Sequence, residues 1–271
     1  MLRFLSYLFG LLVIGLLAAG GGAFYLLDSY GRDLPAHEQL ASYEPPTVTR
    51  VHAGDGRLLA EYATEKRVFV PIGAMPRRVI NAFLSAEDKN FYQHYGIDLL
   101  SVLRAVVTNL QQLGSDRRPV GASTITQQVA KNFLLSNEVS IERKLREALI
   151  ALRIEKAFSK DHILELYLNE IFLGFRSYGV AAAALNYFNK SLDELTIAEA
   201  AFLAALPKAP NNYHPVRYPE AALARRNWVI SRMLEDGHIT LFDAQEAMSE
   251  PLNIRRRDET EVVVADHFAE E

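Results

Sequence analysis

The segment of residues 82–96 holds a carboxylate that could do chemistry. Its glutamate, Glu87, follows Val79 and Phe83 at four-residue steps, so the three side chains share one face of a predicted helix that begins near residue 76. A carboxylate that continues an apolar stripe is partly desolvated, and desolvation raises its pKa toward the range of a general base. The alternative is a structural glutamate at the edge of the core, paired with Lys89 or with a distant cation.

A second carboxylate, Glu147, lies in a predicted helix over residues 140–158. Arg143 and Lys144 precede it by four and three residues, so all three side chains meet on one helix face. Nearby cations are expected to hold Glu147 ionised and to lower its pKa. The structural alternative is an ordinary ion-pair cluster on a solvated helix.

A polar segment between the two glutamates opens another predicted helix. Ser123 or Thr124 is an N-cap candidate, and Thr124 and Gln127 have the spacing of a capping box. The N–H groups at a helix N-terminus favour an anion, and the amide and ammonium groups that follow suit a phosphate. The alternative is a capped and solvated helix start. The polar side chains of this segment are Ser123, Thr124, Gln127, Gln128, Lys131 and Asn132.

The N-terminal composition predicts a membrane anchor. Residues 4–27 form an almost uninterrupted apolar run, and one bilayer span needs about 20 such residues. A cleaved signal peptide is the alternative, although its apolar core is usually only about 7–15 residues long. Arg3 precedes the run, which favours a cytoplasmic N-terminus. We therefore expect a single-pass protein whose remaining residues lie outside the cytoplasm.

The overall composition excludes several classes of protein. The net charge is −4 and the pI about 6.0, which argues against a nucleic-acid partner. The chain contains no cysteine, so disulfides and thiol chemistry are excluded. The sequence has no dedicated metal-ligand motif. A hydrophobic fraction of 49% over 271 residues is ample for a large core.

The patterns divide the chain into four parts. These are an anchor (1–28), a linker with a β-hairpin around Gly54 and Gly56 (29–74), a helical domain (75–250) and the start of a connection (251–271). Within the helical domain, a predicted helix over 99–113 has a wide apolar face that either packs in the core or touches a bilayer. Another predicted helix starts at residue 160 and is expected to end at Gly174.

Five clusters in a fixed order resemble the signatures of the peptidoglycan glycosyltransferases, glycosyltransferase family 51. They cover most of residues 75–215, and their combination is far more specific than any one of them. In order, they are Glu87-x-x-x-Phe91-x-x-His94-x-Gly96, Gly121-x-Ser123-Thr124-x-Thr126-Gln127-Gln128, Arg143-Lys144-x-x-Glu147, Lys160-x-x-Ile163-Leu164-x-x-Tyr167-Leu168-Asn169 followed by Gly174, and Ala201-x-Leu203-x-x-x-Pro207-x-x-Pro210.

The anchor and hairpin resemble the N-terminal half of a class A penicillin-binding protein of the 1a type from a Gram-negative bacterium. Such proteins continue into a transpeptidase with Ser-x-x-Lys and Lys-Thr-Gly motifs, and this sequence has neither. We expect a truncated chain rather than a monofunctional glycosyltransferase. The implied localisation is the inner membrane, with the catalytic domain on the periplasmic side.

The resemblance implies a mainly α-helical fold, with a lysozyme-like head beside a smaller lobe that touches the membrane. The growing glycan strand would be the donor on undecaprenyl pyrophosphate. Lipid II would be the acceptor through its 4-hydroxyl, and a β-1,4 bond would form with inversion. Membrane lipid and other cell-wall synthesis proteins are further expected partners, and no nucleic acid is.

The resemblance also implies roles for individual residues. Glu87 would be the general base, and Glu147 would orient substrate or help hold a divalent ion, Mg or Mn, as a cofactor. Lys131, Arg143 and Lys144 would offset charge on the leaving pyrophosphate. The other expected substrate-binding residues are Asp88, Phe91, His94, Ser123, Thr124, Gln127, Gln128 and Asn132.

Two other functions share some of these features. A lysozyme-like lytic enzyme would also use a helical head and a catalytic glutamate, but a neutral glycan has no pyrophosphate for the cations near Glu147 to bind. A non-enzymatic membrane scaffold for cell-wall synthesis would not need Glu87 and Glu147 together with an anion site. Incubation with lipid II separates these alternatives, because only the transferase forms polymer.

Overall fold

The computed structural model describes residues 66–112, 121–134 and 140–254, the strand residues 49–52 and 58–62, and scattered positions before residue 55. The described part is mainly α-helical, as expected. Its helices are α2 (Arg77–Glu87), α3 (Leu99–Gln111), α4 (Ile125–Leu134), α5 (Ile141–Ala157), α6 (Lys160–Glu170), α7 (Val180–Phe188), α8 (Ile197–Ala205), α9 (Pro219–Glu235) and α10 (Leu241–Ser249), with the 3-10 turns η2 (Ile72–Ala74) and η3 (Leu192–Glu194).

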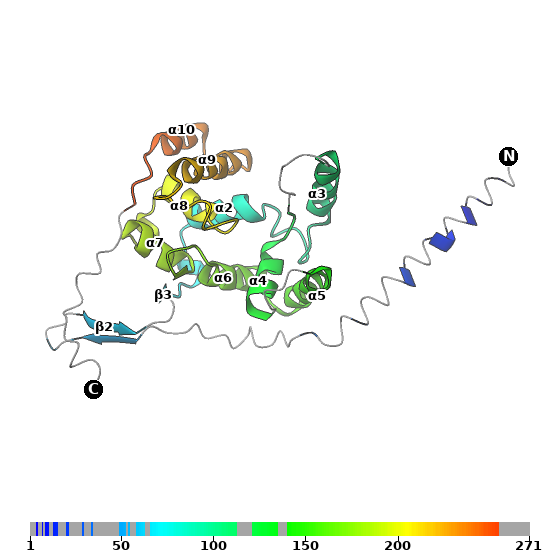
Figure 1. Cartoon of the computed structure of the whole chain (residues 1–271), viewed down its shortest axis with the longest axis horizontal. Coiled ribbons are helices and arrows are strands. Elements are labelled where there is room, and N and C mark those ends of the chain that lie inside the picture. Colours follow the sequence, from blue (N-terminus) through cyan, green and yellow to red (C-terminus); the bar gives the residue numbers. More distant parts are fainter. Residues whose placement is uncertain are drawn as a thin grey trace.

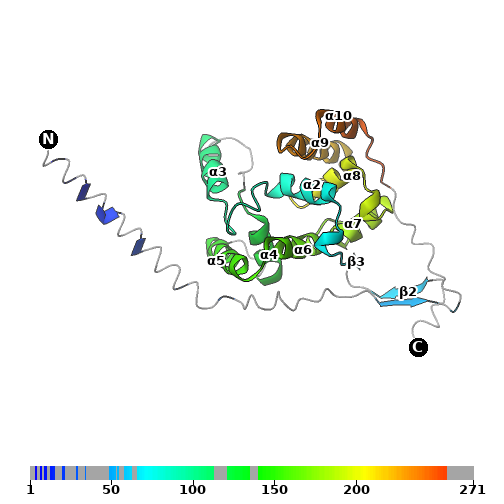
Figure 2. The same cartoon turned by 180° about the vertical axis from the view of Figure 1, so that it is seen from behind.

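The helices pack in two groups (Figures 1 and 2). Helix α2 packs against α8 and α9, and α10 covers α9, whereas α4 packs against α5 and α6. Helix α8 is rich in alanine, and its buried Ala200, Ala201 and Ala204 let α2 and α9 approach closely. One continuous core joins the groups, and its largest rings include Phe83 and Tyr167, which meet edge to face with centroids 6.3 Å apart.

Helix α2 carries the first glutamate to the edge of this core. Pro76 is its N-cap, one residue outside the helix. Val79 and Phe83 are fully buried, which accounts for the apolar stripe seen in the sequence. Glu87 is the last residue of the helix. The stripe therefore ends in a carboxylate where the helix leaves the core.

Helix α3 stands apart from the two groups in both views (Figures 1 and 2). The Asp98 carboxylate caps it by accepting a hydrogen bond from the Ser101 N–H. Ala105 is its one buried residue. The large side chains on its apolar face are exposed, which rules out ordinary core packing within the described structure; they are Leu99, Leu100, Val102, Leu103, Val106, Val107 and Leu110.

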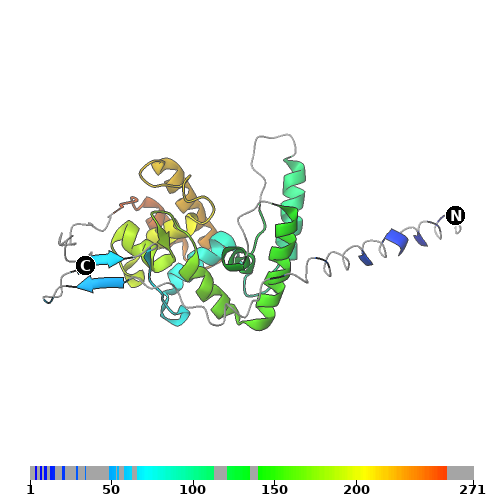
Figure 3. The same ribbon diagram turned by 60° about the horizontal axis from the view of Figure 1, so that its bottom comes forward.

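The strands are short and form two separate pairs. Strand β1 (Thr49–His52) pairs antiparallel with β2 (Leu58–Tyr62) at the position of the predicted hairpin, and this pair lies to one side of the helices (Figure 3). Strand β3 (Lys66–Arg67) pairs parallel with β4 (Ser177–Tyr178). Beyond β3, the Val70 N–H and C=O both bond the Asn169 side chain, at 2.8 and 2.9 Å, instead of another strand.

Helix α6 is shorter than predicted. It ends at Glu170, because the Ile171 carbonyl turns away to accept a hydrogen bond from the Gly179 N–H. Gly174 has a φ of +80°, as a helix terminator would, but it lies in the turn that leads into β4. The prediction of a helix that reaches Gly174 was wrong by one turn.

Several sequence predictions fall on residues that the structure does not describe. The predicted anchor of residues 4–27 lies mostly outside them, and so does most of the predicted connection of residues 251–271. Among the described residues, no helix is both long and apolar enough to cross a bilayer.

Candidate active site

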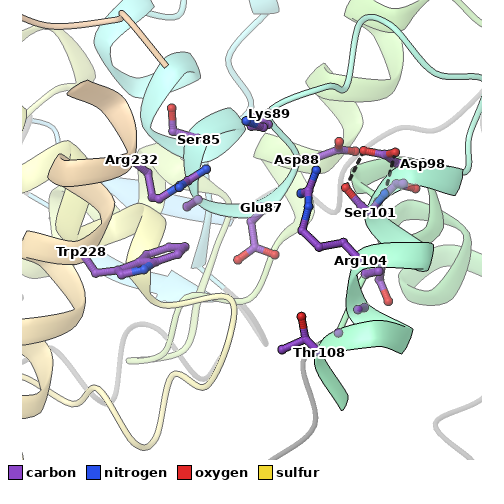
Figure 4. A pocket seen from close by; sticks show the side chains of 16 residues that line it. Ser85, Glu87, Asp88, Lys89, Asp98, Ser101, Arg104, Thr108, Trp228 and Arg232 are labelled. Carbon is purple, nitrogen blue, oxygen red and sulfur yellow. Dashed lines mark hydrogen bonds between the residues drawn. The ribbon is translucent and has the colours of Figure 1, made fainter. Parts of the chain in front are cut away.

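A cavity of about 290 Å³ lies where α2, α3 and α9 meet the residues before α4. Figure 4 shows Glu87 between the side chains of α9 on one side and those of α3 on the other. Two of the predicted site residues in its wall, Glu87 and Asp88, come from the end of α2. Ser123 and Thr124, before α4, are predicted residues that also line the cavity. Arg104 and Thr108 of α3 and Trp228 and Arg232 of α9 complete this part of the wall.

The Glu87 carboxylate is held by an amide. Its Oε2 accepts a hydrogen bond of 2.8 Å from Gln128 Nε2. The Tyr167 hydroxyl lies 3.5 Å from Gln128 Oε1, on the other side of the same amide. This arrangement directs the amide donor of Gln128 at Glu87 and fixes the orientation of the carboxylate.

Burial raises the pKa of Glu87. The Gln128 hydrogen bond and the positive charges of Arg225 and Lys208 act in the opposite direction, and the charge of Asp88 adds to the rise. A raised pKa makes the ionised carboxylate a stronger base, which suits it to accept a proton. This agrees with the environment expected from the apolar stripe.

The ion-pair cluster of Glu147, Arg143 and Lys144 lies at the edge of this cavity. Glu147 is buried and pairs with the Lys144 ammonium and, at 3.6 Å, with Arg143 Nη1. Lys144 Nζ also donates a hydrogen bond of 2.7 Å to Ser123 Oγ, and Ser123 lines the cavity. A buried carboxylate does not fit the alternative of an ion-pair cluster on a solvated helix.

The start of α4 is capped as the sequence predicts. The Thr124 N–H donates to Gln127 Oε1 at 3.0 Å, and the Gln127 N–H donates to Thr124 Oγ1 at 3.2 Å. The Thr124 hydroxyl donates to the Gly96 carbonyl at 2.6 Å. The capping box therefore centres on Thr124, and not on Ser123.

The helix N-terminus already holds an anion of the chain itself. The Ile125 N–H donates to Asp88 Oδ2 at 3.0 Å, and Asp88 also contacts His94 Nε2 at 3.0 Å from both of its oxygens. Phe91 is fully buried, with the Lys160 ammonium 4.4 Å from its ring centroid. Asp88, Phe91 and His94 thus fix the turn after α2 against α4.

The remaining predicted residues lie outside the cavity wall. Gln127 is buried within its capping box, and Lys131 and Asn132 are exposed on α4. Gln128 reaches the cavity only through its contact with Glu87. The structure thus brings the two glutamates to one region, and it leaves Lys131 and Asn132 at the surface.

Comparison with known proteins identifies the family. Residues 55–234 match the family model described as Transglycosylase. The chain belongs to this family. It is 52% identical over 269 residues to the penicillin-binding protein 1A of Rickettsia felis, a match that covers 99% of this chain and 34% of that protein. It is 45% identical over 262 residues to the penicillin-binding protein 1A of Aquifex aeolicus, which covers 95% of this chain and 35% of that protein.

A solved structure, that of penicillin-binding protein 1A from Haemophilus influenzae, also matches. The two are 29% identical with a TM-score of 0.48, and the match covers 84% of this chain and 24% of that chain. This transglycosylase chain spans about a third of the length of the curated relatives that it matches.

The sequence reasoning missed the contribution of α9 to the candidate site. Arg225, Trp228 and Arg232 follow one another at three- and four-residue steps, so they share one helix face. Trp228 and Arg232 line the cavity, and the charge of Arg225 acts on Glu87. That spacing of cations around an aromatic residue was the signal in the sequence.

A dedicated metal site is not formed by the described residues. No three histidine, aspartate or glutamate side chains of the described part gather where they could hold an ion. Glu147, the expected helper, is already paired with Lys144 and Arg143. We therefore derive no step through a divalent cation.

Proposed function

We propose that this chain polymerises lipid II into glycan strands by β-1,4 transglycosylation, with inversion and release of undecaprenyl pyrophosphate, in peptidoglycan synthesis. The observation that carries the proposal is Glu87, a carboxylate with a raised pKa that lines a cavity beside cationic side chains. Membership of the Transglycosylase family supports the reaction class.

In the proposed reaction, Glu87 accepts the proton of the 4-hydroxyl of lipid II as that oxygen attacks the anomeric carbon of the donor. The Gln128 amide keeps the receiving carboxylate oriented. A single direct displacement inverts the anomeric carbon, which accounts for the stereochemistry.

The leaving pyrophosphate needs positive charge, because negative charge develops on it as the bond breaks. Lys144 and Arg143 meet at Glu147, and Lys144 also reaches Ser123 in the cavity wall. In our proposal, Glu147 holds these two cations in place rather than taking a proton. Lys131, exposed on the neighbouring helix α4, would extend the same positive region.

We also propose that α3 is the part of the smaller lobe that touches the membrane, beside a lysozyme-like head. Leu99, Leu103 and Leu110 are each more than 60% exposed on one apolar helix, as in helices that lie in a bilayer interface. Together with the predicted anchor of residues 4–27, this supports a location at the inner membrane, with the catalytic domain on the periplasmic side. Other cell-wall synthesis proteins would be its partners there.

A polymerisation assay with purified lipid II and the detergent-solubilised chain tests the proposed function. Formation of long glycan strands by the wild type, and not by a Glu87→Gln variant, is the expected result. Cleavage of finished glycan would instead indicate a lytic enzyme. Partner binding without either activity would indicate a scaffold.

A further inference from the structure

Trp228 is the one tryptophan in the chain, and it lies in the wall of the cavity that contains Glu87. Of the described residues that line this cavity, it alone is aromatic. Its side chain is 41% exposed. In Figure 4 the indole ring extends from α9 toward the side of the cavity where the Glu87 carboxylate lies.

The indole is held in place on one side. The Arg225 guanidinium lies 3.8 Å from its ring centroid, and such a cation–π contact fixes the ring because the cation is attracted to the negative face. Arg225 is itself partly desolvated, and burial lowers its pKa. The result is a large apolar surface presented to the cavity in a fixed orientation.

The size of the cavity limits what this surface can meet. About 290 Å³ is just below the roughly 300–1,000 Å³ of ligand pockets, which leaves room for about one sugar unit beside Glu87. A pyranose ring has a face of C–H bonds and an edge of hydroxyl groups. Covering that face with an aromatic ring removes apolar area from water, and the negative face of the indole attracts the positively polarised C–H groups.

We propose that Trp228 is a sugar-stacking residue of the acceptor subsite. Its indole packs against the apolar face of the pyranose that carries the attacking hydroxyl and holds that hydroxyl toward Glu87. Arg104 of α3, across the cavity from Trp228 (Figure 4), faces the hydroxyl-bearing edge of the same sugar. This inference rests on the proposed function, because it assigns the subsite for one of the two sugars in that reaction.

Because Trp228 is the sole tryptophan, its fluorescence reports on this subsite directly. Lipid II is titrated into the full chain carrying Glu87→Gln, in which turnover is blocked, and the indole emission is followed. We expect a saturable change with lipid II and none with undecaprenyl pyrophosphate, which lacks the sugars. An equal change with undecaprenyl pyrophosphate would overturn the inference, since the indole would then respond to the lipid or the pyrophosphate.

Kinetics of Trp228 variants provide a second measurement. Truncation of an aromatic side chain that anchors a binding contact costs more than about 1 kcal/mol, so we expect Trp228→Ala to raise the KM for lipid II about tenfold, or about 1.4 kcal/mol. The kcat should change much less. Trp228→Phe keeps a flat aromatic face and should recover most of the lost affinity. Thermal melting of each variant separates a lost contact from lost folding.

Phe242→Ala is the matched control. Phe242 is 72% exposed on α10 and does not line the cavity, so its truncation should leave KM unchanged. This inference alone would be overturned if the wild type polymerises lipid II, the indole emission of the Glu87→Gln chain does not change with lipid II, and Trp228→Ala keeps a normal KM. A wild type that does not polymerise lipid II would overturn the proposed function, and the inference with it.

Discussion

Replacement of Glu87 by glutamine changes the chemistry of the site and little else. The amide has the shape of the carboxylate, and its oxygen can still accept the hydrogen bond that Gln128 Nε2 donates to Glu87. The variant cannot take a proton from an attacking hydroxyl. Loss of a general base lowers a rate by about 10²–10⁴-fold, or about 2.7–5.4 kcal/mol at 1.36 kcal/mol for each tenfold.

The pH dependence of the wild type tests the same assignment. Burial raises the pKa of Glu87, so the carboxylate takes up a proton at a higher pH than an exposed glutamate does. A base must be ionised to act. The rate should therefore fall on the acidic side, and the fall should begin above the pH range in which exposed glutamates titrate.

The same pKa shift has a consequence for stability, with a definite sign. Because the pKa of Glu87 is higher in the folded than in the unfolded state, the ionised group destabilises the fold at pH values above its folded pKa. Below the unfolded pKa both states are protonated and the penalty is absent. Glu87→Gln should therefore unfold at an equal or higher temperature than the wild type at neutral pH, and this gain should vanish as the pH falls.

The assays are lipid II polymerisation, binding of the substrate or of a phosphoglycolipid inhibitor, and thermal unfolding between acidic and neutral pH. Glu246→Gln, an exposed carboxylate of α10, controls for the loss of one negative charge. Near wild-type polymerisation by Glu87→Gln would refute the mechanism and leave the family unchanged. A marked loss of stability at neutral pH would refute the reasoning about burial.

Three further predictions concern the surroundings of the site. A form that lacks residues 1–28 should still bind liposomes weakly in a flotation assay. This binding should fall further when Leu103 and Val106, both exposed on α3, are replaced by serine. If the form that lacks residues 1–28 does not float with liposomes at all, α3 makes no membrane contact. Lys131→Ala should weaken binding of a pyrophosphate-bearing substrate by about ten- to hundredfold, the value of a charge-assisted contact, and unchanged affinity in a titration removes it from the site. Glu147→Gln should lower both the rate and, by about 1–3 kcal/mol, the free energy of unfolding, because Arg143 and Lys144 lose the buried carboxylate that pairs with them. Denaturant unfolding at the wild-type level would argue against that role.

Local patterns predicted the elements well. The stripe that ends at Glu87 and the capping box of Thr124 each depend on residues within a few positions of one another, and the structure has both. The end of α6 was mispredicted because a distant group decided it. The Gly179 N–H, and not a local glycine, takes up the Ile171 carbonyl.

The limits of local reasoning are clearest at the start of α4. The sequence indicated an anion at this helix N-terminus, and the structure supplies one from within the chain, the Asp88 carboxylate. No pattern within the segment of α4 could show that a carboxylate 37 residues earlier satisfies it. The part played by α9 was missed for a related reason, since its distance to Glu87 depends on how the helices pack.

The two hydrogen bonds that fix α4, from Ile125 to Asp88 and from Thr124 to the Gly96 carbonyl, join residues 37 and 28 positions apart. Single helices relax in about 0.1–1 μs, whereas such non-local contacts form only after the chain has lost the entropy of closing the intervening loop. We therefore expect the geometry of the candidate site to be acquired late in folding. A refolding chain should recover its helical signal before it recovers any affinity for lipid II.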